Sequence, residues 1–359
     1  MPVSALAPPP VVPPSLANGE TLYAVNPNMR LPYTLEWNLA IEQSLGREQV
    51  LRTSYVGADG ERLLQTANIV FPATGSYNFA AANLVTNAGI SRYNALQVQY
   101  QRRLSKGLQA MASYSWAHSI DTGSSGSTGD PSNALALLNS NDNRGNSSFD
   151  IRQTLTSGVT YQLPGSWSNA FAKSILGGWS LESILQARTP PPVNIYYSAL
   201  GALTNGFAAA TRPDTVPGLP FYLYGSGYPG GKALNPAAFA PPPLDPTTGD
   251  PTAQGDLARN ALRGFGMVQW DVGIHREFSL RESLKLQFRA ELFNGLNHPN
   301  FAPPVGDLGS PGALNPQFGL SVQNLAQGLS SNGIGNGGFD PLYQIGGPRS
   351  IQLALKLAF

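Results

Sequence analysis

Hydrophobic and polar residues alternate one by one through several long stretches of this chain. The last nine residues show the pattern most clearly, because Ile351, Leu353, Leu355, Leu357 and Phe359 occupy every second position. A period of two places such residues on one face of a β-strand and leaves the other face to the residues between them. The C-terminal residues are therefore predicted to form an amphipathic strand that ends on an aromatic side chain.

Nine stretches with this alternation predict an all-β chain. They cover residues 34–45, 49–57, 92–104, 108–119, 149–162, 178–189, 266–278, 284–294 and 349–359. Most of them are longer than the ~5–6 residues that are usual for strands of soluble proteins. A tilted strand needs ~9–11 residues to cross a bilayer. The lengths of these stretches therefore favour transmembrane strands.

The segments that join the predicted strands alternate between short and long. The short ones are 46–48, 105–107, 163–177 and 279–283, and the long ones are 58–91, 120–148, 190–265 and 295–348. Short periplasmic turns and long extracellular loops are typical of outer-membrane barrels. We therefore predict a partial antiparallel transmembrane β-barrel over residues 32–359. A soluble β-sandwich is the alternative.

Aromatic residues gather at both ends of the predicted strands. At the long-loop end are Trp37, Trp116 and Trp270, and at the short-turn end are Tyr161, Trp179, Phe278 and Phe359. Two aromatic girdles at the two membrane interfaces are expected for a membrane barrel. Ordinary cross-strand aromatic pairs at the edges of a sheet would be the other explanation.

The number of predicted strands indicates that the sheet is incomplete. Bacterial single-chain barrels have an even number of strands and both ends on the periplasmic side. With nine strands and a C-terminal strand that ends at a short-turn position, the first strand starts on the long-loop side. We therefore expect further strands upstream of residue 34.

The N-terminal residues 1–31 are predicted to be an irregular, proline-rich segment. Residues 1–16 have no basic region, and prolines interrupt their apolar stretch, so they do not resemble a secretory signal. An outer-membrane protein needs export, and we therefore expect an export signal to be encoded upstream.

The amino-acid composition further limits the classes of protein to which the chain can belong. The 22 Lys and Arg residues nearly balance the 21 Asp and Glu residues, so charge does not favour nucleic acid as a partner. Charged residues make up 12% of the chain, about half of the ~25% usual for soluble domains. There is no cysteine, which excludes disulfides and thiolate metal sites. The chain contains no run of 18 apolar residues, so no transmembrane helix is predicted.

Several stretches resemble the C-terminal part of Oar-like TonB-dependent receptors. They are PYTLEWNLAIEQSL (32–45), SYVGADG (54–60), RYNALQVQYQRR (92–103), GLQAMASYSWAHSI (107–120), NRGNSSFDIR (143–152), GGWSL (177–181), RAELFNGLNHPNF (289–301) and PRSIQLALKLAF (348–359). Together they make up 87 of the 359 residues, about a quarter of the chain, in the order that the family has them. The stretch 289–301 is the most specific.

The resemblance implies a plugged barrel of about 22 strands that takes up a large or scarce ligand, such as an oligosaccharide, peptide or chelate. It also implies that Leu353, Leu355, Leu357 and Phe359 are the recognition signal for barrel assembly. Expected partners are outer-membrane lipid, the barrel-assembly machinery, and a plug with further strands. The chain matches neither the family's plug nor its carboxypeptidase-regulatory-like domain, so it is not expected to transport actively alone.

The three histidines do not predict a metal site. His118, His275 and His298 each stand alone in a strand or at a strand end, without metal-ligand spacing. His298 lies in the sequence Asn-His-Pro-Asn after the eighth strand. It is expected to stabilise a turn or line the barrel rim, with ligand binding as the alternative.

Other motifs are weak. Gly230, Gly231 and Lys232 are similar to part of a phosphate loop, but Ser226 and Ala233 break that motif. Residues 139–150 are rich in oxygen ligands, yet lack the acidic register of a calcium loop, so a hydrated loop is expected. Residues 123–129 are expected to be a flexible Gly/Ser tract.

Charged residues on the polar face of the predicted strands are expected to form cross-strand ion pairs or to contact a plug. They are Arg103, Arg152, Arg188, Arg289, Glu182, Glu277 and Glu291. In a soluble sheet they would form a solvated face.

No enzyme is predicted, because His118 and Asp121 have no evident third partner for acid–base chemistry. No cofactor is expected, and the residues that bind ligand are not identified. The alternative functions are an adhesin-like or glycan-binding surface module and a gene fragment without a function of its own.

Overall fold

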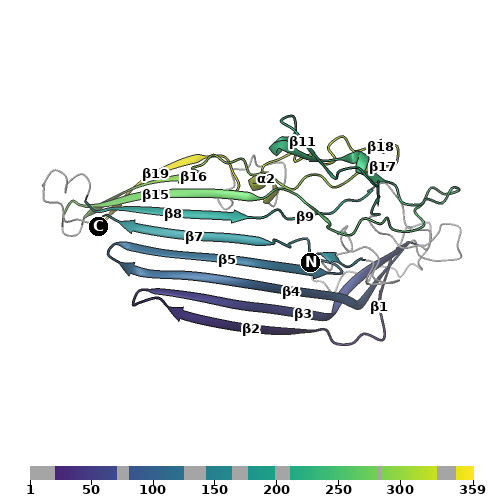
Figure 1. Ribbon diagram of the computed structural model, residues 1–359, viewed down its shortest axis with the longest axis horizontal. Coiled ribbons are helices and arrows are strands. Elements are labelled where there is room, and N and C mark those ends of the chain that lie inside the picture. Colours follow the sequence, from purple (N-terminus) through teal and green to yellow (C-terminus); the bar gives the residue numbers. More distant parts are fainter. Residues whose placement is uncertain are drawn as a thin grey trace, which may run out of the picture.

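The computed structural model describes residues 21–70, 81–124, 143–163, 177–198, 211–281, 284–329 and 345–359. One large sheet dominates these residues (Figure 1). Its strands are β2 (Tyr33–Ser44), β3 (Gln49–Val70), β4 (Ala81–Ser105), β5 (Leu108–Asp121), β7 (Gln153–Gln162), β8 (Trp179–Arg188), β15 (Met267–Ser279), β16 (Lys285–Phe293) and β19 (Ser350–Ala358). Each of the nine predicted strands is therefore confirmed. None of the described helices is long and apolar enough to span a membrane.

Neighbours in the sequence are neighbours in the sheet, and every pair along this path is antiparallel. Tight turns enforce this order. The turn between β4 and β5 places Lys106 at φ 51° and Gly107 at φ 77°, which is a left-handed conformation. At Gly107 a Cβ atom would lie 2.5 Å from the carbonyl oxygen of Gln162, so both the backbone angle and the space require glycine there.

The register joins the hydrophobic positions of all nine strands into one continuous apolar face. Across the first strands, Leu39 lies opposite Tyr55, Tyr55 opposite Leu96, and Leu96 opposite Trp116. The same face ends at β19, where Leu355 lies opposite Phe288. Large side chains on this face remain exposed, which in water would be unfavourable. The exposed face is suited to lipid.

The opposite face is polar along its whole width. It joins Gln97 to Ser115, Ser115 to Thr154, and Thr154 to Arg188. At the other end of the sheet, His275 lies opposite Arg289. The two faces predicted from alternation are thus the two faces of the sheet.

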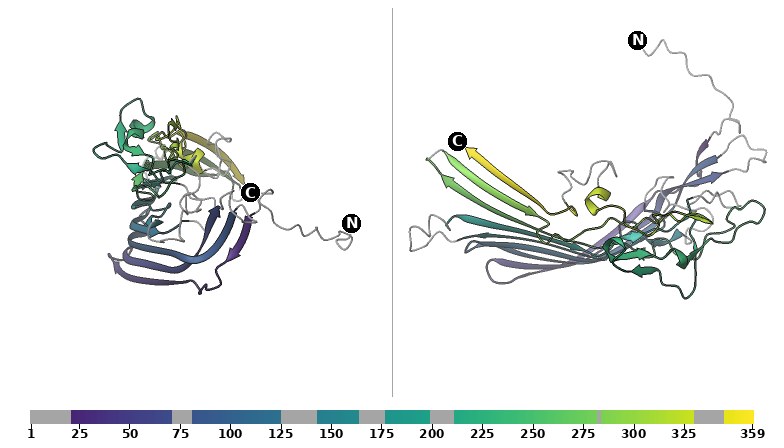
Figure 2. Two further views of the ribbon diagram at one scale, coloured as in Figure 1. Left: turned by 90° about the vertical axis from the view of Figure 1, so that its right-hand side faces the viewer. Right: turned by 90° about the horizontal axis from the view of Figure 1, so that it is seen from above.

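The sheet is strongly curved and does not close (Figure 2). Its edge strands are β2 and β19, and within the described residues each pairs on one side only. This arrangement corresponds to a partial barrel.

The prediction of a loop over residues 58–91 was wrong for most of that segment. Strand β3 continues to Val70 and β4 begins at Ala81, with register shifts between Gly60, Leu63 and Gln65. These irregularities interrupt the alternation of side chains, which is why the pattern did not reveal the extension. Residues 71–80 lie outside the described residues.

Strand β1 (Thr21–Val25) lies within the segment that was expected to be irregular. It pairs in parallel with residues 81–85 of β4, in the extended part of the long hairpin. Residues 1–20 lie outside the described residues.

The start of β7 also differs from the prediction. The strand begins at Gln153 and not at Phe149. Asp150 instead belongs to a turn in which its N–H donates to the carbonyl of Ser147 at 2.9 Å.

The long segments 190–265 and 295–348, expected to be loops, contain a small folded structure. We call the described residues 190–198, 211–265 and 295–329 the loop unit. Its short elements are β9 (Pro192–Val193), β10 (Asp214–Thr215), β11 (Tyr222–Tyr224), η5 (Pro229–Gly231), β12 (Lys232–Leu234), η6 (Pro236–Ala238), β13 (Phe239–Ala240), β14 (Leu262–Arg263), β17 (Gly309–Ser310), β18 (Ala313–Leu314) and α2 (Leu325–Leu329). In Figure 1, β11, β17 and β18 lie on the side opposite the C-terminus, past the ends of β8 and β15.

A hydrophobic core holds the loop unit together. Ile195 and Leu234 from the first long segment pack with Leu308 and Phe318 from the second. The ring of Phe239 stacks on Phe221, and an edge contact joins it to Phe318. The loop unit is therefore a packed body at the ends of β8 and β15.

The apolar face gives a direct test of membrane contact. Arg in place of Val98, midway along the membrane part of β4, should cost about 2–4 kcal/mol if it faces the bilayer midplane. The free energy of unfolding of the full-length gene product, refolded in lipid vesicles, measures this cost. Gln99→Arg, on the adjacent polar face, is the matched control and should cost about 1 kcal/mol or less. Equal costs at both positions would contradict the assignment of the faces.

Candidate ligand site

Two arginines, one fully buried and one partly buried, attach the loop unit to the ends of β5 and β7. The first, Arg259, has a fully buried side chain and forms an ion pair with the carboxylate of Asp121. It also donates to the carbonyls of Asp121 at 2.7 Å and Asn143 at 2.9 Å. These acceptors replace the hydrogen bonds to water that the guanidinium group loses on burial, and so offset the free-energy cost of burying its charge.

The second arginine, Arg263, forms an ion pair with Asp150 and donates to the Asp150 carbonyl at 2.6 Å. His118 lies 3.3 Å from the other carboxylate oxygen of Asp150. Burial by itself raises the pKa of Asp150, but hydrogen bonds from Arg263, the Ser119 N–H and His118, with the charge of Arg263, bring it below the ordinary 3.8. Asp150 is therefore the partner of His118, and Asp121 is not.

These contacts also change the interpretation of residues 139–150. Residues 139–142 lie outside the described residues, but Asn143, Ser147 and Asp150 are buried, so a hydrated loop was wrong for them. The Asn143 amide donates to the Thr122 carbonyl at 2.6 Å and accepts from Arg212. The oxygen atoms of these side chains are therefore engaged in hydrogen bonds with other groups of the protein. Of the predicted Gly/Ser tract 123–129, residues 125–129 lie outside the described residues.

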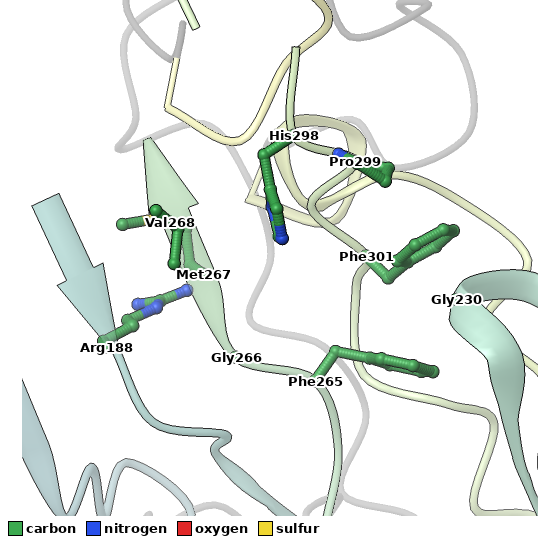
Figure 3. Close-up of a pocket in the computed structure, with 9 residues that line it drawn as sticks. All are labelled: Arg188, Gly230, Phe265, Gly266, Met267, Val268, His298, Pro299 and Phe301. Atoms are coloured by element: carbon green, nitrogen blue, oxygen red, sulfur yellow. The ribbon is translucent and has the colours of Figure 1, made fainter. Parts of the chain in front are cut away.

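A cavity of about 550 Å³ lies where β8 and β15 meet the loop unit. It is lined by Arg188, Gly230, Phe265, Gly266, Met267, Val268, His298, Pro299 and Phe301. Figure 3 shows the His298 ring extending toward the start of β15, and Arg188 reaching toward Met267 from β8. The Phe265 and Phe301 rings lie together beside Gly230, with their centroids 5.3 Å apart.

A second cavity of about 340 Å³ shares His298, Pro299 and Phe301 with the first. Its remaining walls come from residues after β16 and before β19, including Asn294, Asn324 and Gly347. The two cavities form one region lined by aromatic rings, amides, one histidine and one arginine. We call this region the candidate ligand site.

His298 has the turn-stabilising position expected for it and also lines both cavities. Asn294 has φ 48°; its side chain accepts from the His298 N–H at 3.0 Å and donates to the His298 carbonyl at 2.9 Å. The His298 ring Nδ1 lies 3.1 Å from the side-chain oxygen of Asn300. Side-chain hydrogen bonds therefore fix the backbone that presents the ring.

Lys232 has a structural role that differs from that of a phosphate-loop lysine. Its ammonium group donates to the Gly264 carbonyl at 2.5 Å and lies 4.9 Å from the ring centroids of Tyr222 and Phe265. Desolvation by burial lowers the pKa of Lys232. At Gly230 a Cβ atom would lie 2.6 Å from the Phe265 ring and 2.9 Å from that of Phe301. Glycine is thus needed for close packing with the two rings.

The polar face of the sheet contains the expected cross-strand ion pairs at some positions. Glu182 pairs with Arg289 at 3.4 Å and with His275 at 3.3 Å, and Arg289 pairs with Glu291 at 2.8 Å. Glu277 pairs with Lys285 at 2.7 Å. In contrast, Arg103, Arg152 and Arg188 have no ion pair within the described part of the chain. No cluster of three or more potential metal ligands occurs there either.

The aromatic residues of the two predicted girdles all lie on the apolar face. They are Trp37, Trp116, Tyr161, Trp179, Trp270 and Phe278, with Leu353, Leu355 and Leu357 on the same face of β19, which ends one residue before Phe359. Arg276 lies over the rings of Trp179 and Phe278, at 5.7 and 4.5 Å from their centroids. Membrane anchoring and assembly recognition by these residues remain predictions.

Residues 2–327 match the model of a protein family described as the outer membrane beta barrel domain. The chain belongs to this family. In an outer-membrane barrel the apolar face contacts lipid and the polar face lines the interior. Arg188 and the ion pairs around Glu182 therefore belong to the barrel interior, and the loop unit stands at the end of the barrel with the long connections.

Two solved structures of outer-membrane transporters are similar to this chain at low sequence identity. The transporter YddB from Escherichia coli is 11% identical, with 97% of this chain and 34% of that chain covered and a TM-score of 0.48. The FrpB iron transporter from Neisseria meningitidis is 11% identical, with coverage of 94% and 32% and a TM-score of 0.43. This chain spans about a third of the length of these proteins. A search of curated proteins gave no match.

The buried pair of Arg259 and Asp121 predicts a strong local effect. Arg259→Met leaves a buried carboxylate without its partner, which should cost about 3–5 kcal/mol in the attachment of the loop unit. Hydrogen exchange of amides in residues 211–263 measures this local free energy. Adding Asp121→Leu removes the unpaired charge and should restore most of the loss. A cost below about 1 kcal/mol for Arg259→Met would contradict a role in attachment.

The lowered pKa of Asp150 predicts a pH dependence. Because the pKa in the folded protein lies below the ordinary 3.8, the stabilisation is complete above that value and is lost as the pH falls through the folded pKa. The loop unit should therefore become more susceptible to pepsin as the pH is lowered from 4 to 2. In Asp150→Asn the increase in pepsin susceptibility between pH 4 and pH 2 should be smaller, since the titrating group is absent. An identical pH profile for both proteins would exclude Asp150 as its source.

Proposed function

We propose that this chain is the C-terminal barrel part of a TonB-dependent receptor that takes up a large or scarce ligand. The observation that supports this most directly is the open sheet, with long strands and two edges that have no second partner among the described residues. Unpaired backbone groups in lipid cost several kcal/mol each, so such a sheet needs further strands to complete a barrel.

The loop unit supports a receptor function. It is a packed structure at the outer end of the barrel and encloses the candidate ligand site together with β8 and β15. Loops on a rigid barrel are suited to capture a ligand from outside. The resemblance of residues 289–301 and the other matching stretches to Oar-like receptors points in the same direction.

Energised transport needs more than this chain in our proposal. A plug would gate the barrel and would connect it to the energy-transducing protein of the inner membrane. Outer-membrane lipid and the barrel-assembly machinery are the other proposed partners. The ligand would be an oligosaccharide, a peptide or a chelate.

The reading frame upstream of the Met1 codon tests this proposal. We expect it to continue through more alternating strands, a plug and an export signal. A stop codon immediately upstream in that frame would overturn the proposal, and would favour a surface module or a gene fragment. In cells that carry the complete gene, the protein should fractionate with the outer membrane and migrate differently on gels before and after boiling.

A further inference from the structure

Two arginines on the interior face of the sheet lie beside the candidate ligand site. Arg188 ends β8 and lines the larger cavity. It lies opposite Thr154 of β7 in the register. The same register continues past β7, where the Ala117 N–H donates to the Arg152 carbonyl at 2.9 Å. Arg152 therefore lies on the same face, two residues from the position opposite Arg188.

Neither guanidinium is neutralised by a carboxylate of the residues that the structure describes. Arg188 is half-buried and has no hydrogen bond or ion pair within the described ranges. Nη1 of Arg152 is buried and lacks a hydrogen-bond partner there as well. A buried, charged donor without an acceptor costs considerable free energy, so this group is expected to have a partner in the working protein.

The nearby carboxylates already have other partners. Asp150 is paired with Arg263 and His118, and Asp121 with Arg259. Asp271, on the same face, accepts from the Gln269 side chain at 3.0 Å and the Asn294 N–H at 2.8 Å. Among the described residues that line the two cavities, none is acidic. The charge of this region is therefore positive.

The rest of the site is apolar and aromatic. Phe265, Phe301 and Met267 line the larger cavity, and His298 adds a ring nitrogen that can donate or accept. An anion held by arginine beside aromatic rings combines charge-assisted hydrogen bonds with apolar burial. Arginine is particularly suited to this because its planar fork can bind both oxygens of a carboxylate.

We propose that the candidate ligand site binds a ligand with a carboxylate attached to an apolar or aromatic body. Arg188 receives the carboxylate, Arg152 adds a second charged donor, and the rings of Phe265 and Phe301 contact the body of the ligand. This inference rests on the proposed receptor function for its biological meaning, but the binding step requires neither a plug nor energy coupling.

The test compares two probes of nearly the same shape, 1-naphthoate and the neutral 1-naphthamide. Titration calorimetry with the full-length gene product, purified in detergent, should show about tenfold or greater preference for 1-naphthoate. Arg188→Gln should weaken 1-naphthoate binding about tenfold and leave 1-naphthamide within about twofold. Arg152→Gln should act in the same direction.

Arg103→Gln is the matched control, because Arg103 is an exposed arginine at the end of β4 that leads into the short turn to β5. It should leave the affinity for both probes unchanged. Arg188→Lys keeps the charge without the planar fork, and should retain part of the preference. Heat-modifiable migration on gels confirms that each variant forms a barrel.

Equal affinity of the unsubstituted protein for the two probes would overturn the proposal, as would the absence of binding to either. So would an equal loss of both probes in a correctly folded Arg188→Gln protein. These outcomes are independent of the upstream reading frame. Selective binding with a closed reading frame would refute only the receptor function, and an open frame without selective binding would refute only the anion site.

Discussion

Backbone hydrogen bonding between adjacent strands is the constraint on which the rest of this structure depends. Hydrocarbon offers no water to an unpaired N–H or carbonyl group, so a strand in the membrane must pair along its whole length. The ladders from β2 to β19 meet this requirement between neighbouring strands, with register shifts near Leu63 and beside the β4–β5 turn, and leave only the two edges unpaired among the described residues. Once the ladders fix the register, every second side chain contacts lipid and the others line the interior. The apolar face and the interior ion pairs are both consequences of that register.

The membrane part of the fold could be predicted because each strand has one side facing the bilayer and the other facing the barrel interior. Apolar and polar residues must therefore alternate with a period of two. The stretch 284–294 is an example: its alternating Leu, Phe and charged residues gave β16 with almost correct bounds. Outside the bilayer this constraint disappears. In residues 58–70 register shifts near Leu63 break the alternation, so a paired strand was mistaken for a loop.

The candidate ligand site was harder to predict from the sequence for a related reason. Its walls come from β8, β15 and two long connections, and their proximity depends on contacts between residues more than 100 positions apart, such as Asn260 with Asn146. His298 was recognised as a turn or rim residue because Asn and Pro surround it. Phe265 and Phe301 gave no such signal. A cluster of aromatic residues in a long loop could have indicated a packed core.

The core of the loop unit includes side chains from both sides of the hairpin formed by β15 and β16. Val193 and Leu234 precede that hairpin in the chain, whereas Leu308 and Phe318 follow it. All four meet at one side of the membrane, although the connecting strands cross it twice. Because neither segment holds the complete core, the core can form only after both segments have reached that side. Their meeting outside would oppose backward movement of the hairpin, so that packing of the outer surface makes insertion difficult to reverse.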